Sequence, residues 1–274
     1  MPSRVVARRT VLRVEGGRAR PRSDQLAAEE PLEIRVNGDA VSVTMRTPGD
    51  DFDLALGFCL TEGILASPDE VATIRYCSDQ PGPYTGEFNV VDIATRSATP
   101  VAAELRRNVY TSSSCGLCGT ASIEAVRKRA ESVAGDAVQV QGATLLTLPE
   151  RLREAQRVFE RTGGLHAAGL FTATADLRCL REDVGRHNAV DKVIGWAAAN
   201  GALPLSGHVL MVSGRVAFEI AQKALIARIP IIAAVSAPSS LAVELADEAG
   251  MTLAGFIRGS SLNLYAGERR VLLS

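Results

Sequence analysis

Apolar and polar residues alternate over short runs in the first third of the chain. Residues 32–36 and 41–45 each place an apolar side chain at every second position, and Asn37-Gly38-Asp39 stands between the two runs. Successive side chains of a strand point to opposite faces, and an Asn-Gly pair tolerates the positive φ of a tight turn. The pattern therefore predicts a β-hairpin.

A helix and two more strands are predicted behind this hairpin. Asp50 and Asp51 can cap a helix that runs to about Leu60, and Gly63 ends it. Strand-like runs then cover residues 71–77 and 87–94, with a Pro- and Gly-rich loop at 79–83. The first hundred residues therefore predict a small α+β unit.

Strands and helices alternate through the second half of the chain. One helix is predicted from about Thr120 to Val133, and another over 149–162, opened by Pro149 and closed by Gly163-Gly164. The remaining predicted elements are strands over 166–173, 177–182, 208–213, 231–236 and 251–258 and helices over 188–199, 216–228 and 239–249. Short apolar strands between helices are typical of a buried sheet, so the pattern predicts an α/β domain with helices packed on a mostly parallel sheet.

These patterns divide the chain into three parts. With 274 residues it is long enough for one large domain or two modest ones. We predict a flexible basic arm over 1–22, an α+β domain over 23–110, and an α/β domain over 111–274 that begins with the loop around Cys115 and Cys118.

The composition excludes several classes of protein. Hydrophobic residues make up 46% and charged residues 22% of the chain, as in folded soluble proteins. A formal net charge of −1 provides no basic field for nucleic acid, and no apolar run is long enough to span a membrane. The five cysteines are odd in number and the chain is too large to need disulfides, which favours a reducing, cytoplasmic setting.

The first 22 residues stand apart by their charge. They contain seven arginines and one acidic residue, Glu15, and they lack the apolar core of a signal peptide. A frayed terminal arm is the favoured interpretation. A docking arm for an acidic partner is the alternative.

Cys115-Gly116-Leu117-Cys118 carries the strongest chemical signal. Two thiols at this spacing can ligate a metal, exchange a disulfide or hold a persulfide, and the helix predicted just downstream would favour a thiolate. A structural zinc site needs more ligands than this pair supplies. A thioredoxin-type redox pair, two inert buried cysteines and a nucleophilic, sulfur-handling thiol are the other interpretations. We favour the sulfur-handling thiol.

Further candidates lie where predicted strands end. The segment 181–188, followed by Asp191 and Lys192, opens a helix, and there Arg186 could bind phosphate and His187 could relay a proton. A helix cap with surface ion pairs is the alternative. Three other strand ends carry small, hydroxyl or basic residues: 213–215, 236–240 and 256–261. His166 alone is more typical of a core histidine.

Taken together, these motifs resemble the FdhD-type accessory sulfurtransferases of formate dehydrogenase from about residue 32 to the end. The resemblance depends on five segments in this order: 50–58 with 61–64, 113–119, 163–168, 182–192 and 213–215. It implies that the second domain has the three-layer α/β/α fold of the cytidine deaminases. A zinc deaminase needs H-x-E and P-C-x-x-C, whereas Ala168 stands two residues after His166 and Ser239 follows Pro238. We therefore expect neither catalytic zinc nor deamination.

The resemblance also implies a function. A cysteine desulfurase would load a persulfide sulfur on Cys115, with Cys118 assisting, and the protein would pass it to the bis-molybdopterin guanine dinucleotide form of the molybdenum cofactor for the formate dehydrogenase catalytic subunit. The guanine nucleotide, with GDP as its mimic, would bind Phe256, Ile257, Arg258, Gly259, Ser260 and Ser261. The family also implies a homodimer. A cofactor-binding chaperone without catalysis and a thiol–disulfide oxidoreductase are the alternatives.

Overall fold

The structure is a computed structural model that describes residues 5–77, 88–97 and 131–273. Cys115 and Cys118 lie outside these residues, as do the loop predicted at 79–83, the domain boundary at 110/111 and nearly all of the helix predicted over 120–133. Within the described ranges, no helix is long and apolar enough to cross a lipid bilayer.

The N-terminal unit is a four-stranded sheet with one helix packed on it. Its elements are β3 (Glu30–Val36), β4 (Asp39–Arg46), α1 (Asp51–Thr61), the short 3-10 turn Pro68–Glu70, β5 (Val71–Tyr76) and β6 (Val90–Thr95). The strand order is β4-β3-β6-β5, in which β3 and β6 are parallel and the outer pairs are antiparallel. The alternation in the sequence has the expected result, because Leu32 and Ile34 on one face of β3 pack with Leu54 of α1.

The predicted hairpin and helix are confirmed, with one difference at the helix start. Asn37 and Gly38 have φ of 53° and 83°, as the turn residues require. Asp50 also lies in the left-handed region, at φ 53°, and its side chain makes no capping hydrogen bond to α1. Its carboxylate lies 3.5 Å from Nε of Arg181 instead, so the residue predicted to cap the helix forms an ion pair.

The second domain extends over the rest of the described chain. Its elements are β7 (Val140–Gln141), α3 (Gly142–Ala155), α4 (Arg157–Thr162), β8 (His166–Thr172), β9 (Leu177–Asp183), α5 (Arg186–Ala199), β10 (His208–Val212), α6 (Phe218–Ile226), β11 (Ile231–Ala234), α7 (Ser240–Ala249), β12 (Thr252–Arg258), β13 (Ser261–Ala266), the 3-10 turn Glu268–Arg270 and β14 (Val271–Leu272). Six strands form one sheet in the order β13-β12-β11-β10-β8-β9, and β7 pairs with β14 apart from it.

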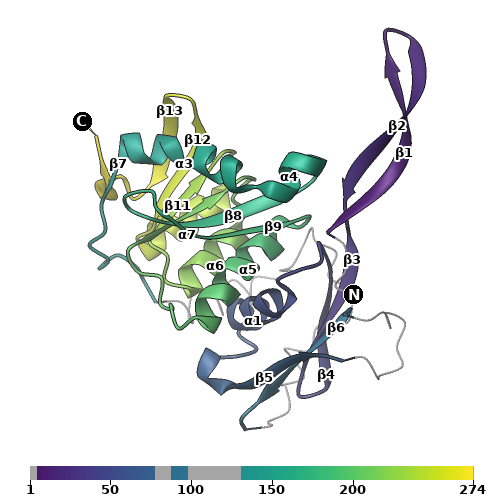
Figure 1. The fold of residues 1–274 in the computed structure, drawn as a ribbon. Coiled ribbons are helices and arrows are strands. Elements are labelled where there is room, and N and C mark those ends of the chain that lie inside the picture. The colour runs from purple at the N-terminus through teal and green to yellow at the C-terminus, as the bar shows by residue number, and fades with distance from the viewer. Residues whose placement is uncertain (1–4, 78–87, 98–130, 274) are drawn as a thin grey trace.

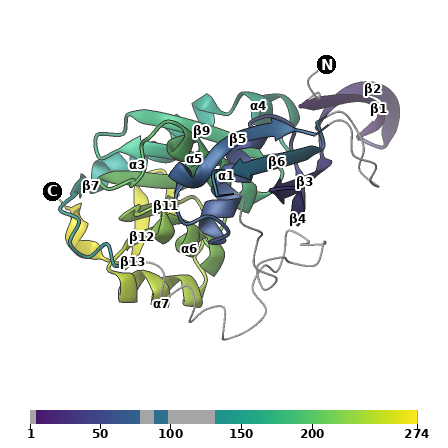
Figure 2. The ribbon, with the colours of Figure 1, turned by 90° about the horizontal axis from the view of Figure 1, so that it is seen from below.

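The six-stranded sheet is the middle of three layers (Figures 1 and 2). On one face, Leu210 and Ile232 pack with residues of α5, α6 and α7. On the other face, Met211 and Ala233 pack with Leu148 and other residues of α3. The predicted layered fold is confirmed, and its likeness to the cytidine deaminases stays a prediction.

The prediction of a mostly parallel sheet was wrong. Only β10, β11 and β12 run parallel to one another, whereas β8, β9 and β13 are antiparallel to their neighbours. Short turns at 173–176 and 259–260 join β8 to β9 and β12 to β13, and connections of that length permit only antiparallel pairing. Strand β13 itself was not predicted.

The helix predicted over 149–162 is two helices, and it begins earlier. Pro149 lies inside α3 rather than at its start. The buried residues Leu145, Leu148 and Leu152 lie on one helical face against the sheet. Their burial outweighs the hydrogen bond that Pro149 cannot donate.

The prediction of a frayed basic arm was also wrong. From Val6 the segment is an antiparallel hairpin of β1 (Val6–Glu15) and β2 (Arg18–Ala27), joined at Gly16-Gly17 with φ of 57° and 77°. The hairpin extends away from the rest of the molecule (Figure 1). A Gly-Gly turn between two ten-residue runs was the available signal, and the arginines obscured it.

Two glycines let the N-terminal unit and the second domain meet closely. A Cβ on Gly57 of α1 would overlap the backbone carbonyl of Asp191, and one on Gly195 of α5 would overlap that of Asp53. Only glycine permits helices to approach to this distance. This contact places the N-terminal unit beside one end of the sheet.

Candidate functional site

The strand ends singled out in the sequence meet at one edge of the six-stranded sheet. β9, β10, β11 and β12 all end at this edge, and β8 begins there because it is antiparallel to β10. We call it the carboxyl edge and define it by five segments: His166, 183–188, 213–215, 236–240 and 256–261. Ligands of α/β domains bind at such edges.

Asp183 connects this edge to the N-terminal unit. Its carboxylate is fully buried and accepts hydrogen bonds from the backbone N–H of Gly185 (2.8 Å) and of Thr47 (3.1 Å) and from Nδ2 of Asn188 (3.0 Å). Nζ of Lys192 lies 2.7 Å from the same carboxylate and donates to the Thr47 carbonyl. Because the polar side-chain atoms of Asp183, Asn188 and Lys192 are all satisfied within the chain, these residues of the segment 181–192 are structural.

A second buried ion pair joins α1, α5 and α6. Nζ of Lys223 lies 2.9 Å from Asp191 and 3.3 Å from Glu62, and it donates to Oγ1 of Thr61 at 2.8 Å. Burial alone would lower the pKa of Lys223, but the carboxylates of Asp191 and Glu62 outweigh it and raise that pKa. The ammonium therefore stays charged.

Arg181 and Arg46 complete the junction between the two units. Arg181 donates to Oδ2 of Asp53 on α1 through Nη2 at 2.8 Å and Nε at 3.1 Å. The wholly buried Arg46 binds Asp51 through Nε and Nη2. We call the ion pairs of Asp183, Asp191, Arg181 and Arg46 the junction network.

The next residues of the same segment have no such partners. Nε of Arg186 and Nε2 of His187 are buried, and neither has a hydrogen-bond partner among the described residues. Nε2 of His187 lies 4.0 Å from Oε2 of Glu219. Burial and then the Arg186 charge lower the pKa of His187 to about 4, so its imidazole is neutral near pH 7.

His166 lies beside this pair at the start of β8. Its Nδ1 lies 3.2 Å from the position that a Cβ on Gly214 would take, and burial and the Arg186 charge lower its pKa. His166 is half-buried rather than a core residue, unlike the interpretation favoured from the sequence. A guanidinium and two neutral imidazoles can bind an anion and donate or accept a hydrogen bond.

The segment 256–261 forms the other end of the carboxyl edge. Phe256 has φ of 50°, and its ring is partly exposed beside Arg258, whose Cζ lies 5.6 Å from the ring centroid. Nε of Arg258 donates to the Val235 carbonyl at 3.4 Å. Ile257 is 1% exposed and belongs to the core, so it can only support this surface. An exposed ring in a conformation that non-glycine residues avoid is a mark of a functional position.

These two ends of the edge are well separated. Phe256 lies at the end of β12 and Arg186 follows β9, and β11, β10 and β8 lie between these strands. Arg186 itself lies next to the end of β10, because a Cβ on Gly214, just after that strand, would be 3.9 Å from Cβ of Arg186. Two strand spacings of about 4.8 Å, or roughly 10 Å, therefore separate Arg186 from β12. A ligand that contacts both must be long, with an aromatic group at one end and an anionic group at the other.

Two of the three described cysteines are poorly suited to be the reactive thiol. Cys59 and Cys179 are buried, and burial raises the pKa of Cys179 to about 12 and that of Cys59 further still. Thiols protonated to this degree are poor nucleophiles. Cys77 is partly exposed. Within the described part of the chain, no group of three or more His, Cys, Asp or Glu side chains is arranged to hold a metal ion.

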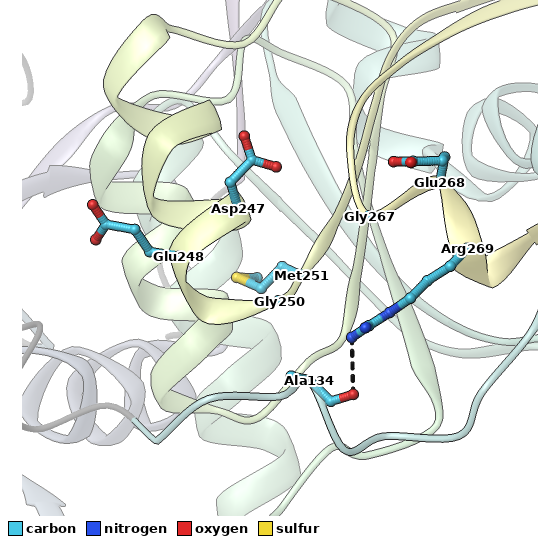
Figure 3. A pocket seen from close by; sticks show the side chains of 8 residues that line it. All are labelled: Ala134, Asp247, Glu248, Gly250, Met251, Gly267, Glu268 and Arg269. Atoms are coloured by element: carbon cyan, nitrogen blue, oxygen red, sulfur yellow. Dashed lines mark hydrogen bonds between the residues drawn. The ribbon is translucent and has the colours of Figure 1, made fainter.

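A cavity of about 320 Å³ lies at the opposite edge of the sheet (Figure 3). Gly250 and Met251 precede β12 and Gly267 follows β13, so the cavity is remote from Phe256. Its lining includes the carboxylates of Asp247, Glu248 and Glu268, and Nη2 of Arg269 donates to the Ala134 carbonyl at 2.9 Å. This charge is unsuited to an anionic ligand.

The sequence analysis did not single out Thr47, Glu219 or Lys223. The rarity of lysine could have drawn attention to Lys223, since the chain has 27 arginines and only three lysines. Two of those lysines, Lys192 and Lys223, are buried in the junction network. The partners of Thr47 are more than 130 residues away in the sequence, and no local pattern reveals them.

Comparisons with known proteins agree on one family. The model of the FdhD/NarQ family matches residues 27–272. The chain is 56% identical over 273 residues to the sulfur carrier protein FdhD of Streptomyces avermitilis, covering 98% of this chain and 97% of that protein. It is 53% identical over 269 residues to the sulfur carrier protein FdhD of Mycolicibacterium paratuberculosis, covering 97% and 99%.

One solved structure shares the fold. It comes from Desulfotalea psychrophila and is described as a formate dehydrogenase accessory protein. Its TM-score with this chain is 0.76 at 22% identity, and the match covers 98% of this chain and all of that one. The fold described above is therefore that of a protein already known from a crystal.

Proposed function

Because the chain belongs to the FdhD/NarQ family, we propose that it is a sulfur carrier that serves formate dehydrogenase. The observation that carries this proposal is the 56% identity, over nearly the whole of both chains, to a protein named as a sulfur carrier. The described part of the chain adds support, since the raised pKa values of its two buried cysteines, Cys59 and Cys179, make them poor nucleophiles. Cys115 and Cys118 are then the best candidates for the working thiols.

The first step is a transfer between two sulfur atoms. The Cys115 thiolate attacks the terminal sulfur of a persulfide on a cysteine desulfurase, a new S–S bond forms on Cys115, and the desulfurase leaves as a thiolate. No net oxidation occurs, because one persulfide replaces another. Cys118 assists release by attacking Cys115, which expels hydrosulfide and leaves a disulfide, so the two thiols supply the electrons.

The recipient in this proposal is bis-molybdopterin guanine dinucleotide, bound as a substrate along the carboxyl edge. Phe256, Arg258 and the turn to Ser261 would receive a guanine nucleotide, which stacks on an aromatic ring and is held by an arginine. Arg186, roughly 10 Å along the edge, would bind an anionic group of the same long molecule. The proposal also includes a homodimer, as the resemblance implies, and a reducing, cytoplasmic setting, as the odd number of cysteines favours.

The mass of the intact protein after loading tests the carrier role. The protein is incubated with a cysteine desulfurase and cysteine, and its mass is measured with and without reductant. Wild type and Cys118→Ser should each gain one sulfur that reductant removes, and Cys115→Ala should gain none. Cys59→Ser is the matched control. Because Cys59 is buried and should not take up sulfur, this variant should load like wild type. Loading of Cys115→Ala equal to that of wild type would remove Cys115 from the carrier role.

Activation of formate dehydrogenase then separates the carrier from its alternatives. Cys115→Ala should fail to activate the enzyme while staying folded, and Cys118→Ser should load sulfur but release it poorly. A cofactor chaperone without catalysis would leave both variants active. A redox pair would make both variants equally inactive and would form the internal disulfide without prior sulfur loading, whereas the carrier forms it only when a loaded sulfur is released.

A further inference from the structure

The β1–β2 hairpin has two chemically different faces. Alternate residues of a strand share a face, and the pairing register sets Leu12 opposite Pro21 and Val14 opposite Ala19. These four residues make one face apolar near the tip. Leu12 is 66% and Val14 64% exposed, although side chains of this kind are normally buried. An isolated two-stranded hairpin is at best marginally stable in water, so an uncovered apolar face on it indicates a binding surface.

The opposite face is rich in arginine. It holds Arg9, Arg13, Arg18, Arg20 and Arg22, all of them exposed. Within the hairpin, Glu15 pairs with Arg13 and Arg20. In the described part of the chain no acidic side chain pairs with Arg9, Arg18 or Arg22. We call the hairpin over 6–27, with its apolar and arginine faces, the basic arm.

The basic arm is anchored next to the carboxyl edge. Arg161 of α4 donates to Oε1 of Gln25 at 2.9 Å, and a Cβ on Gly164 would lie 3.6 Å from Cβ of Ala27. Two residues after Gly164 the chain enters β8 at His166. The base of the arm thus lies beside the edge where we place the cofactor, and the tip extends away from it (Figure 1).

We propose that the basic arm docks an acidic, partly apolar surface segment of the protein that receives the cofactor. This inference rests on the proposed function for the identity of that protein, formate dehydrogenase. Charge complementarity supports it, because the arm carries six arginines against two acids in a chain of net charge −1. Arginine is enriched in protein interfaces, and the fully buried centre of an interface is more apolar than the rest of the surface.

Two features favour a protein over nucleic acid. The first aromatic residue of the chain is Phe52, so the arm has nothing on which a base could stack. Outside the arm the chain has an excess of acidic residues, which would repel a phosphate backbone.

Binding to purified formate dehydrogenase apoprotein, measured by biolayer interferometry, tests the proposal. Arg18→Glu with Arg22→Glu reverses two charges on the arginine face, and Leu12→Ser with Val14→Ser removes the apolar face. The matched control is Arg75→Glu with Arg178→Glu, two exposed arginines far from the arm. We expect each arm variant to raise Kd at least tenfold, the charge reversal mainly by slowing association, and the control to change it less than twofold.

Sulfur loading is measured on the same variants by intact mass. Normal loading with weakened binding supports the docking arm, whereas absent loading in wild type would refute the carrier role instead. Binding by the arm variants equal to wild type overturns the proposal, and so does wild type that fails to bind the apoprotein. Dissociation of a dimer in the arm variants, with apoprotein affinity unchanged, would identify a second copy as the occupant and also overturn it.

Discussion

The junction network and the carboxyl edge contain the same kinds of side chain in opposite states. In the junction network, Asp183, Lys192 and Arg46 are wholly or almost wholly buried, and each has close charged partners. At the carboxyl edge, Arg186 and His187 bury nitrogen atoms that have no partner among the described residues. The two regions are connected, because residues 183–192 run directly from one into the other.

This difference separates charges that folding explains from charges that it does not explain. A buried charge is costly unless it is paired, so a fully paired set is explained by folding alone. A buried polar atom without a partner has no such explanation within the chain, and a ligand is one way to satisfy it. Asp183 and Arg186 are both charged and lie three residues apart in the sequence. Their hydrogen-bond partners alone distinguish the paired residue from the unpaired one.

The largest expected effect comes from breaking the junction network. Asp183→Ala leaves the Lys192 ammonium buried without its carboxylate and removes the acceptor for two backbone N–H groups. Removing one partner of a buried pair typically costs about 3–5 kcal/mol. Urea denaturation should show that loss. Glu160→Ala, at an exposed position of α4, should change stability by less than about 0.5 kcal/mol. A loss for Asp183→Ala no greater than for Glu160→Ala would contradict the structural assignment.

Acid should destabilise the protein through His187. The folded pKa of about 4 lies below the ordinary value of 6.5, so protons bind the unfolded chain more readily. The stability due to the neutral imidazole is therefore complete above pH 6.5 and is lost as the pH falls from 6.5 toward 4. The loss approaches about 3 kcal/mol, at 1.36 kcal/mol per pKa unit.

The charged groups around His187 set the design of that experiment. Arg186, Lys223 and His166 disfavour its protonation, whereas the nearby Glu62 and Glu219 favour it. Urea midpoints at pH 7.5, 6 and 5 should fall more steeply for wild type than for His187→Gln, which has no proton to gain. Parallel curves for the two proteins would show that another group controls the acid response.

The sequence predicted most elements but not the difference between these regions. The strand and helix order of the second domain follows from local apolar periodicity, which a short window contains. The partners of Asp183 include Thr47, 136 residues away, and those of Lys223 include Thr61, 162 residues away. The segment 181–192 was therefore predicted as one ligand-binding cluster, whereas folding divides it into a structural half and an unpaired half. For the basic arm the error was of the opposite kind. The local Gly-Gly turn was visible in the sequence, but the arginine content led to the prediction of a frayed segment.

Two arginines at opposite ends of the carboxyl edge should affect different ligands. Arg258→Ala should weaken GDP binding, measured by calorimetry, by roughly 10- to 100-fold, because a charge-assisted hydrogen bond contributes about 1.5–3 kcal/mol. Arg186→Ala should weaken GDP binding less than Arg258→Ala does, because Arg186 lies two strand spacings, roughly 10 Å, from β12, but should reduce activation of formate dehydrogenase. Arg178→Ala is the exposed control, expected to alter neither. Equal GDP affinity in wild type and Arg258→Ala would remove Arg258 from the nucleotide site.

The smallest expected change in stability tests whether Phe256 keeps its strained backbone for a ligand. At φ 50° a non-glycine residue is disfavoured by about 1 kcal/mol, and the partly exposed ring recovers little by burial. Phe256→Gly should therefore leave the free energy of unfolding unchanged or raise it by up to about 1 kcal/mol, while weakening GDP binding. Phe256→Ala keeps the strain and also loses the ring, so it should weaken GDP binding equally without the gain in stability. Unchanged GDP affinity in both variants would mean that the ring does not stack on the base, and that the strain at this position has another cause.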